Sequence, residues 1–468
     1  YLYLSGAEMV SKVLTFAAIA YLARVAGPSG FGYVEFASAV LLCAGLIVDQ
    51  GFGPYGAREI ARSPARTAEV VAEIIGARLI LAFATYGVVV LLLLLYHPAP
   101  ILTRLILIYG LGLLVMPLLL QWVFQGHDQM QTVAIMGLVR QGVYAALVFA
   151  LLREASQIWV AAVAEVAGVC SVAVYGLWVY HRRFGSGLRA RLTLSSHLLR
   201  EGVPIGLGQM FWMVRMFGAT VILGLVEFPQ DVGFFGGAMR ILVALHSFVW
   251  LYYFNLLPSL ARAWKQSREA FAQTIAQSLH MVIWGGIVGG IVWVAAAPMV
   301  MVAAYGPAFA PAGATLQWLA GVFLAAAISG HYRFGLIAAG RQNLEMITSA
   351  LGSACAVALI PLGYVRGGAT GAAMGLVFAE AVVWLASWWL AHSRLKLRDH
   401  ARPTIYAALA AATGMGLLWY LPLPSLALRT TLAVAWAASA AFVLDRMIRL
   451  RAWHTVGWFW SRGRRLLD

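Results

Sequence analysis

The chain has 468 residues, of which 62% are hydrophobic and 11% are charged, and its formal net charge is +15. Soluble domains carry roughly a quarter charged residues, so this composition excludes a water-soluble globule and predicts an integral membrane protein. The basic residues lie mostly between the apolar runs, which is the pattern of membrane topology and not of nucleic-acid binding.

The apolar runs predict an all-α polytopic membrane protein. A spanning helix needs about 20 mostly apolar residues, and this length predicts about fourteen helices. β-Strands are excluded because the runs are too long and lack alternation with a period of two. The predicted helices lie at 6–24, 31–52, 71–96, 101–124, 132–152, 156–180, 201–226, 232–258, 272–297, 312–338, 344–362, 367–391, 404–421 and 425–445.

The basic residues gather on one side of the predicted membrane. Most Arg and Lys lie in the predicted loops 53–70, 181–200, 261–270, 333–343 and 392–403 and after Leu444. This side, with both termini, is therefore predicted to be cytoplasmic. The outer connections are short and offer no place for a large catalytic loop. Neither a phosphate-binding loop nor metal-ligand spacing is evident, so no enzymatic activity and no metal are expected.

The chain also repeats itself. The segment Phe31-Gly-Tyr-Val-Glu-Phe-Ala matches Val232-Gly-Phe-Phe-Gly-Gly-Ala, and two further matches follow at a similar offset. Repeated halves around a site at the membrane midplane are typical of transporters. The sequence therefore predicts two pseudo-symmetric six-helix lobes at 1–180 and 201–391. A helix pair at 404–445 and a basic cytoplasmic tail at 446–468 follow.

Several arginines fall inside predicted helices, where a charge costs at least a few kcal/mol. Arg215 lies near the middle of its helix, and Arg240, Arg140 and Arg78 lie in three others. A guanidinium binds the oxygens of a diphosphate in bidentate fashion without losing its charge, so these residues are candidate substrate contacts. Alternatively, each Arg reaches the interface with its head or neutralises a buried acid such as Glu35, Asp49, Glu165 or Glu380.

Other polar residues complete the predicted cavity. Trp212 and Tyr144 are candidate stacking partners for sugar rings, and Lys12 is a further cation. Lys12 follows Glu8 by one helical turn, so a structural ion pair competes with a cavity role. No bound cofactor is expected, and H+ or Na+ is the candidate coupling ion. Acids and histidines within spans often relay ions, and the candidates are Asp49, Glu165, Glu380 and His246.

Several motifs resemble those of a known family. They are Ala26-Gly-Pro-Ser-Gly-Phe-Gly32, Asp49-Gln-Gly-Phe-Gly-Pro-Tyr-Gly-Ala-Arg-Glu-Ile-Ala-Arg62, Gln121-Trp-Val-Phe-Gln-Gly126, Glu201-Gly-Val-Pro204, Ala238-Met-Arg240 and Gly368-Ala-Thr-Gly-Ala-Ala373. Together they resemble the oligosaccharide flippases (Wzx-type, polysaccharide transporter family) of the MOP superfamily. The resemblance implies two lobes around a central cavity, and it adds Arg24 and Arg58 as basic positions typical of the family.

The resemblance also implies a function. The expected activity is movement of undecaprenyl-diphosphate-linked oligosaccharide from the cytoplasmic to the periplasmic leaflet of a bacterial inner membrane by alternating access. Membrane lipids and polysaccharide assembly proteins are the candidate partners, and nucleic acid is not. A lipid II exporter of the same superfamily is the main alternative. A multidrug exporter fits less well because an Arg-rich cavity repels cationic drugs. A membrane glycosyltransferase or polymerase and a non-transporting scaffold are the remaining alternatives.

Overall fold

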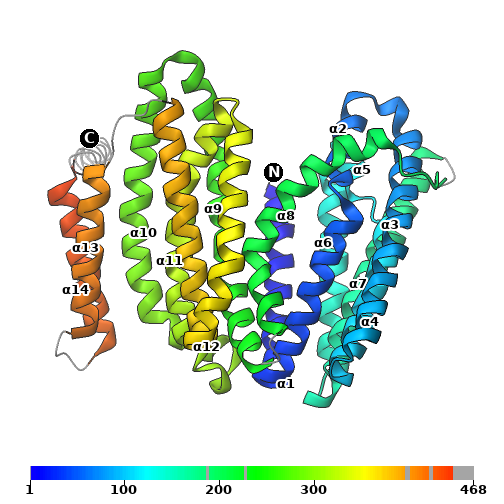
Figure 1. Cartoon of the computed structure of the whole chain (residues 1–468), viewed down its shortest axis with the longest axis horizontal. Coiled ribbons are helices and arrows are strands. Elements are labelled where there is room, and N and C mark those ends of the chain that lie inside the picture. Colours follow the sequence, from blue (N-terminus) through cyan, green and yellow to red (C-terminus); the bar gives the residue numbers. More distant parts are fainter. Residues whose placement is uncertain are drawn as a thin grey trace, which may run out of the picture. The chain divides into compact units, whose positions relative to one another are not determined.

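The computed structural model describes residues 2–185, 189–225, 229–395, 401–420, 425–445 and 449, and all regular structure in these ranges is helical (Figure 1). Eleven helices there are long and apolar enough to cross a membrane, by length and composition. Two of them, α1 and α12, each contain two predicted helices joined across a kink. The predicted all-α fold class is confirmed, and most helix boundaries agree to within about five residues. The helices predicted at 232–258 and 272–297 are wrong at their ends, because they continue to Gln266 and Tyr305, and the helix predicted at 101–124 is divided.

The chain divides into two compact units, which are described separately. The first consists of Tyr1–Gly237 with Ala303–Phe309. Its helices form an apolar core around Phe52, Ile74, Val123 and Phe124, all of which are buried. They are α1 (Leu2–Asp49), α2 (Phe52–Arg62), α3 (Thr67–Tyr96), α4 (Pro100–Val115), α5 (Gln121–Gly126), α6 (Met130–Leu151), α7 (Trp159–Phe184), α8 (Ser196–Gly224) and the start of α9 (Pro229–Gln266).

The second unit consists of Ala238–Val302 with Ala310–Asp468. Besides most of α9, it contains α10 (Arg268–Tyr305), α11 (Ala312–Ala338), α12 (Gln342–Leu395), α13 (Ala401–Tyr420) and α14 (Leu426–Leu444). The antiparallel pair α13 and α14 lies beside α10 (Figure 1), where Asp445 accepts hydrogen bonds from His280 Nδ1 at 2.6 Å and Trp284 Nε1 at 2.9 Å. The predicted lobe boundaries stay a prediction, and the basic tail lies outside the described residues except for Arg449.

The kinks occur where glycine takes a backbone conformation that other residues rarely adopt. In α1, Gly27 has φ 66° and ψ 175° and is followed by Pro28. In α12, Gly367 and Gly368 are non-helical, and Gly368 has φ 56°. Glycine reaches positive φ without the steric cost that a Cβ brings. The predicted pairs of helices at 6–24 and 31–52, and at 344–362 and 367–391, therefore follow each other with almost no intervening loop.

The predicted loop at 53–70 is wrong, because its first part is the helix α2. Phe52, Tyr55 and Ile60 are buried on one face of α2, whereas Arg62 is exposed. Burial of one face and exposure of the other are typical of an amphipathic helix. The Asp49 carboxylate accepts a hydrogen bond from the Gly53 amide at 3.3 Å, which satisfies one of the unbonded N–H groups at the helix start. A short amphipathic helix was read as a loop because it is too short and too polar to span a membrane.

Two equivalent glycines pack against each other's segments within the first unit. A Cβ on Gly32 would lie 1.7 Å from the carbonyl oxygen of Pro229, and a Cβ on Gly233 would lie 2.0 Å from that of Pro28. The same sequence offset separates Pro28 from Pro229 and Gly32 from Gly233. The contact is therefore reciprocal, as expected when two copies of one element meet, and only glycine permits backbones to approach this closely.

Candidate functional site

Arg215, the leading sequence candidate, is deeply buried. It lies on α8 in the first unit and is 2% exposed, which makes it the largest side chain of those that are almost fully buried. Trp212, one turn earlier, is half-buried, and its ring meets that of Phe217 edge to face at 6.1 Å. Arg215 therefore does not reach solvent in this conformation. A role in substrate binding requires a conformation in which α8 opens, and it stays a prediction.

Two of the predicted arginines form ion pairs with two of the predicted ion-coupling acids. Arg78 on α3 pairs with Asp49 at the end of α1, and Arg140 on α6 pairs with Glu165 on α7. The side chains of Arg78 and Asp49 are 5% and 15% exposed, so this pair is largely removed from solvent. The charges of both pairs are neutralised locally, as in the alternative interpretation of these residues. The Arg140 side chain is 40% exposed and remains accessible to a ligand.

Arg24 on α1 contacts the C-terminal end of α10. Its Nε donates to the carbonyl oxygen of Ala304 at 3.0 Å, and its Nη2 donates to that of Ala303. These are among the last carbonyls of α10, which ends at Tyr305, and they have no acceptor role within the helix. A cation at a helix C-terminus is also favoured by the helix dipole. Arg24 thus stabilises the end of α10, although the residue itself is exposed.

Arg58, the second family-type basic position, links α2 to α8. Its Nη2 donates to the Glu201 carboxylate at 2.7 Å, and this hydrogen bond raises the pKa of the Arg58 guanidinium above its ordinary value. The neighbouring Tyr55 contacts the same region, and burial raises the pKa of its phenol. Because both charged side chains are about two-fifths exposed, the pair is a surface tether between two motifs, Gly-Ala-Arg-Glu and Glu-Gly-Val-Pro.

The remaining predicted residues lie on four different helices. In the first unit, Lys12 on α1 is exposed and Tyr144 on α6 is 7% exposed, whereas the Glu8 side chain lies outside the described residues. In the second unit, Glu380 on α12 is 1% exposed and His246 on α9 is half-buried. A ring as buried as that of Tyr144 cannot stack on a sugar without rearrangement.

Arg240 belongs to a polar stripe on α9 that the sequence interpretation missed. Arg240, Ser247, Asn255 and Arg262 recur at helical spacing on one face, and each is at least partly exposed. Arg240 and Arg262 are 22 residues apart, which corresponds to about 33 Å along a helix and so to about the thickness of a membrane core. We name these four residues the α9 stripe. A search for polar residues at a 3.6-residue period along 229–266 would have found it.

The α9 stripe is suited to a wet surface. The Asn255 amide donates to the carbonyl of Leu251 at 2.8 Å, and the Ser247 hydroxyl donates to that of Ala244 at 2.6 Å. Arg262 donates to the Ser259 hydroxyl at 3.1 Å. No carboxylate forms an ion pair with Arg262 among the described residues, so its charge is available to an anion. Amide, hydroxyl and guanidinium groups within a membrane-spanning helix are more stable beside water or a polar ligand than beside lipid.

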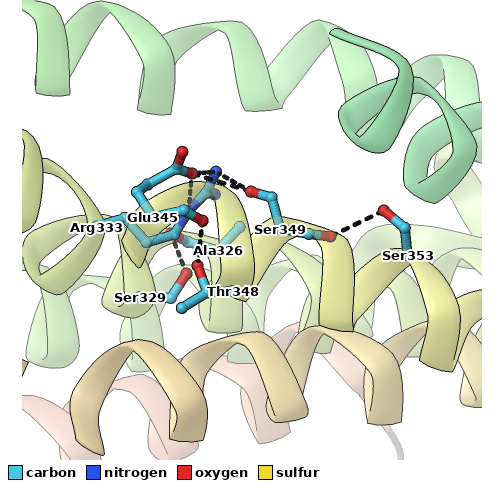
Figure 2. Close-up of polar contacts among 7 residues, drawn as sticks. All are labelled: Ala326, Ser329, Arg333, Glu345, Thr348, Ser349 and Ser353. Atoms are coloured by element: carbon cyan, nitrogen blue, oxygen red, sulfur yellow. Dashed lines mark hydrogen bonds and ion pairs between the residues drawn. The ribbon is translucent and has the colours of Figure 1, made fainter. Parts of the chain in front are cut away.

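A second cluster that the sequence interpretation missed joins α11 to α12 (Figure 2). Arg333 on α11 binds the Glu345 carboxylate through Nε at 2.9 Å and through Nη2, which also donates to the Ser349 hydroxyl at 3.1 Å. Ser349 donates to Glu345 at 2.9 Å, and Ser353 donates to the Ser349 carbonyl at 2.9 Å. Arg333 was read as a topology marker, but the ion pair and the hydroxyl network make it a clamp between two helices. We name this group the Arg333 clamp.

A comparison with known protein families matches part of the chain. A family model described as "Polysaccharide biosynthesis protein" matches residues 1–264. A protein of Escherichia coli (strain K12) named "Putative O-antigen transporter" is 25% identical over 255 residues, which are 51% of this chain and 58% of that protein. The match thus spans less than two thirds of that relative's length.

Solved structures share the fold. The lipid II flippase MurJ in an inward closed conformation superposes with a TM-score of 0.73 at 11% identity, covering 96% of this chain and 100% of that chain. An inward-facing multidrug resistance MATE family transporter of the MOP superfamily gives a TM-score of 0.64 at 15% identity, with coverages of 82% and 94%. A MOP superfamily transporter from Pyrococcus furiosus gives 0.58 at 13% identity, with coverages of 84% and 93%. At these identities the likeness establishes the fold alone.

Proposed function

The chain belongs to the polysaccharide biosynthesis protein family and has the fold of MOP-superfamily transporters, and from this premise we propose that it is a flippase for lipid-linked oligosaccharide. The proposed substrate is an undecaprenyl-diphosphate-linked glycan. The protein moves it from the cytoplasmic to the periplasmic leaflet of a bacterial inner membrane by alternating access. The product serves the export of O-antigen, capsule or exopolysaccharide, and both termini of the protein lie in the cytoplasm.

The α9 stripe is the observation that supports this substrate class best. A lipid-linked oligosaccharide has a dianionic diphosphate, a hydroxyl-rich glycan and a long apolar tail. The stripe provides guanidinium groups at Arg240 and Arg262 for the diphosphate, and amide and hydroxyl groups between them for the glycan. Guanidinium groups bind phosphate oxygens through paired, charge-assisted hydrogen bonds. The apolar tail needs no protein cavity because it can stay in the bilayer.

The ion pairs indicate which arginines are the better candidates for binding the diphosphate. Arg78 and Arg140 each have a carboxylate partner, so a diphosphate would have to compete with Asp49 or Glu165 for them. Arg240 is our leading phosphate contact because it is partly exposed and belongs to the α9 stripe, with Arg262 as its counterpart at the other end of the stripe. Arg215 follows as a contact in a conformation that exposes α8. Transfer of the diphosphate between such positions, as α9 moves, would carry the head group across.

The proposal is tested by following a labelled undecaprenyl-diphosphate sugar across proteoliposome membranes. We expect movement by the wild type and a loss of about tenfold or more in Arg240→Gln, because one bidentate phosphate contact is removed. Arg66→Gln is the matched control, since Arg66 is exposed and, within the described part of the chain, pairs only with the nearby Glu69. Normal transport by Arg240→Gln would remove that residue from the site. No movement by folded wild type in vesicles with verified lipid would refute the substrate class.

The same vesicles distinguish the main alternative. Lipid II carries the same diphosphate but a different sugar and a peptide. We expect the undecaprenyl-diphosphate oligosaccharide to move at least as fast as lipid II in parallel vesicles. Faster movement of lipid II would replace the proposed substrate with the alternative, while the role of the α9 stripe in binding diphosphate would stand.

A further inference from the structure

A chain of hydrogen bonds runs from the edge of the α9 stripe to a fully buried histidine. Tyr252 on α9 is 39% exposed, and its hydroxyl contacts the hydroxyl of Ser278 on α10. The Ser278 hydroxyl lies 2.7 Å from Nε2 of His331 on α11, and Nδ1 of His331 lies 2.7 Å from the hydroxyl of Tyr253. Tyr253 in turn donates to the carbonyl oxygen of Ala327. All of these residues belong to the second unit.

The donors and acceptors fix the direction of this chain. The Ala327 carbonyl can only accept a hydrogen bond, so the Tyr253 hydroxyl donates to it. The Tyr253 oxygen therefore accepts from His331 Nδ1–H. In the neutral imidazole Nε2 is then the acceptor, and it receives the Ser278 hydroxyl proton. The Ser278 oxygen finally accepts from Tyr252. Neutral His331 is thus an acceptor toward the exposed end and a donor toward the buried end.

We propose that His331 is a proton-binding site, which protons enter and leave through Tyr252 and Ser278, and that its protonation couples transport to a proton gradient. A proton that arrives at the Tyr252 oxygen passes to Ser278, and Ser278 passes its own proton to Nε2. Each hydroxyl keeps one proton and reverses its orientation, so the single net change is an added proton on His331. The coupling part of this proposal rests on the proposed function, whereas the protonation part does not.

The imidazole of His331 is fully buried, but the charged groups described around it do not oppose a positive charge there. The nearest charged group on its own helix is Arg333, whose charge is neutralised by Glu345 of α12 in the Arg333 clamp. On α9 and α10 the groups that face the imidazole are the uncharged Tyr252, Tyr253 and Ser278. His280, two residues after Ser278, is directed to Asp445 at 2.6 Å. A proton on His331 therefore does not face an uncompensated cation.

The packing keeps the chain closed at its inner end. A Cβ on Gly330 would lie 2.2 Å from the Tyr253 ring, so glycine at this position lets the ring approach α11. That ring also stacks on Phe334 with centroids 4.9 Å apart. Since this series of hydrogen bonds ends at the Ala327 carbonyl, protons can enter and leave it only at Tyr252. Such a site binds and releases its proton from the same face, which suits alternating access and not a proton channel.

Nuclear magnetic resonance of protein with 15N-labelled histidine, reconstituted in nanodiscs, tests the protonation directly. The His331 signal is identified by its absence in His331→Gln. We expect an Nδ1–H tautomer at high pH and an imidazolium at low pH within the range where the protein stays folded. In Tyr252→Phe, exchange of the Nε2 proton of the His331 imidazolium with solvent should slow by about tenfold or more, because the entrance has lost its hydroxyl.

Tyr406→Phe is the matched control, since it removes a similarly exposed hydroxyl of the same unit that takes no part in these hydrogen bonds. Unchanged exchange in Tyr252→Phe, equal slowing in both variants, or a His331 that stays neutral throughout would each overturn the proton site. The coupling is tested in the lipid-flipping vesicles, where His331→Gln should flip at the same rate with and without a pH gradient. If wild type flips no lipid, the proposed function fails and the resonance result still decides the proton site. A gradient response that persists in His331→Gln would overturn the coupling.

Discussion

The buried pair Arg78–Asp49 allows the cost of a charge inside this protein to be measured. The two side chains are 5% and 15% exposed and form an ion pair between α3 and the end of α1. The Arg78 guanidinium also lies 5.8 Å from the centroid of the Trp122 ring, and Asp49 accepts the Gly53 amide at 3.3 Å. Arg78→Met removes the cation and leaves the carboxylate buried.

The expected loss follows from this geometry. Removal of one partner from a buried ion pair costs about 3–5 kcal/mol, because the remaining charge has lost its counterion. The first unit has roughly 240 residues, and an unfolding entropy of about 2.1 cal/mol/K per residue makes this loss about 6–10 °C in Tm. The double variant Arg78→Met with Asp49→Leu removes both charges. It should fall by only about 2 °C, corresponding to the hydrogen bond that Gly53 loses.

Thermal unfolding of the purified variants in one detergent, followed by tryptophan fluorescence, measures these shifts. Arg66→Met is the control, because the exposed Arg66–Glu69 pair at 2.9 Å should contribute little. The reasoning is refuted if Arg78→Met melts within about 2 °C of wild type, or if the double variant is as unstable as the single one. Transport by a stable double variant would also show that Arg78 and Asp49 are structural and not part of the substrate or ion site.

Three further predictions concern other contacts. Gly32→Ala should strongly lower the Tm, since the new Cβ would lie 1.7 Å from the Pro229 carbonyl oxygen. Thermal unfolding measures this, with Gly137→Ala as the control because nothing lies within 4 Å of a Cβ there. Asp445→Ala should release α14 from α10 by removing the acceptor of His280, which hydrogen exchange of the helix pair would detect as faster exchange. Burial lowers the pKa of His127 below its ordinary 6.5, so the neutral form is favoured in the fold. The stabilisation from neutral His127 is present above pH 6.5 and is lost as the pH falls below it. Between pH 7.5 and 5.5 the Tm of His127→Gln should therefore fall less than that of wild type.

Each of these has a contrary outcome. Equal melting of Gly32→Ala and Gly137→Ala would mean that the two segments do not touch. Unchanged exchange of α14 in Asp445→Ala would assign its docking to apolar packing alone. A pH profile of His127→Gln identical to that of wild type would mean that other groups set the acid sensitivity.

The sequence determined the class of the protein and most of its helices. Spanning helices are the simplest part of a structure to predict, because each needs only about 20 apolar residues and satisfies its own backbone. The family resemblance and the fold class were also confirmed. The resemblance rests on motifs such as Ala26-Gly-Pro-Ser-Gly-Phe-Gly32, which contains the kink of α1. The helix α2 was missed because a short amphipathic helix lacks the apolar length by which spanning helices are recognised.

Only the tertiary structure decided which charges are partnered. Arg78, Arg140 and Arg333 look alike in sequence, yet each pairs with a carboxylate on another helix, and Arg24 binds carbonyl groups at the end of α10. His331 showed no signal, because its partners Tyr253 and Ser278 are more than fifty residues away. An ionisable side chain in a membrane acquires its role from the groups within hydrogen-bonding distance. Those groups come from other helices whose rotation and depth no local pattern encodes.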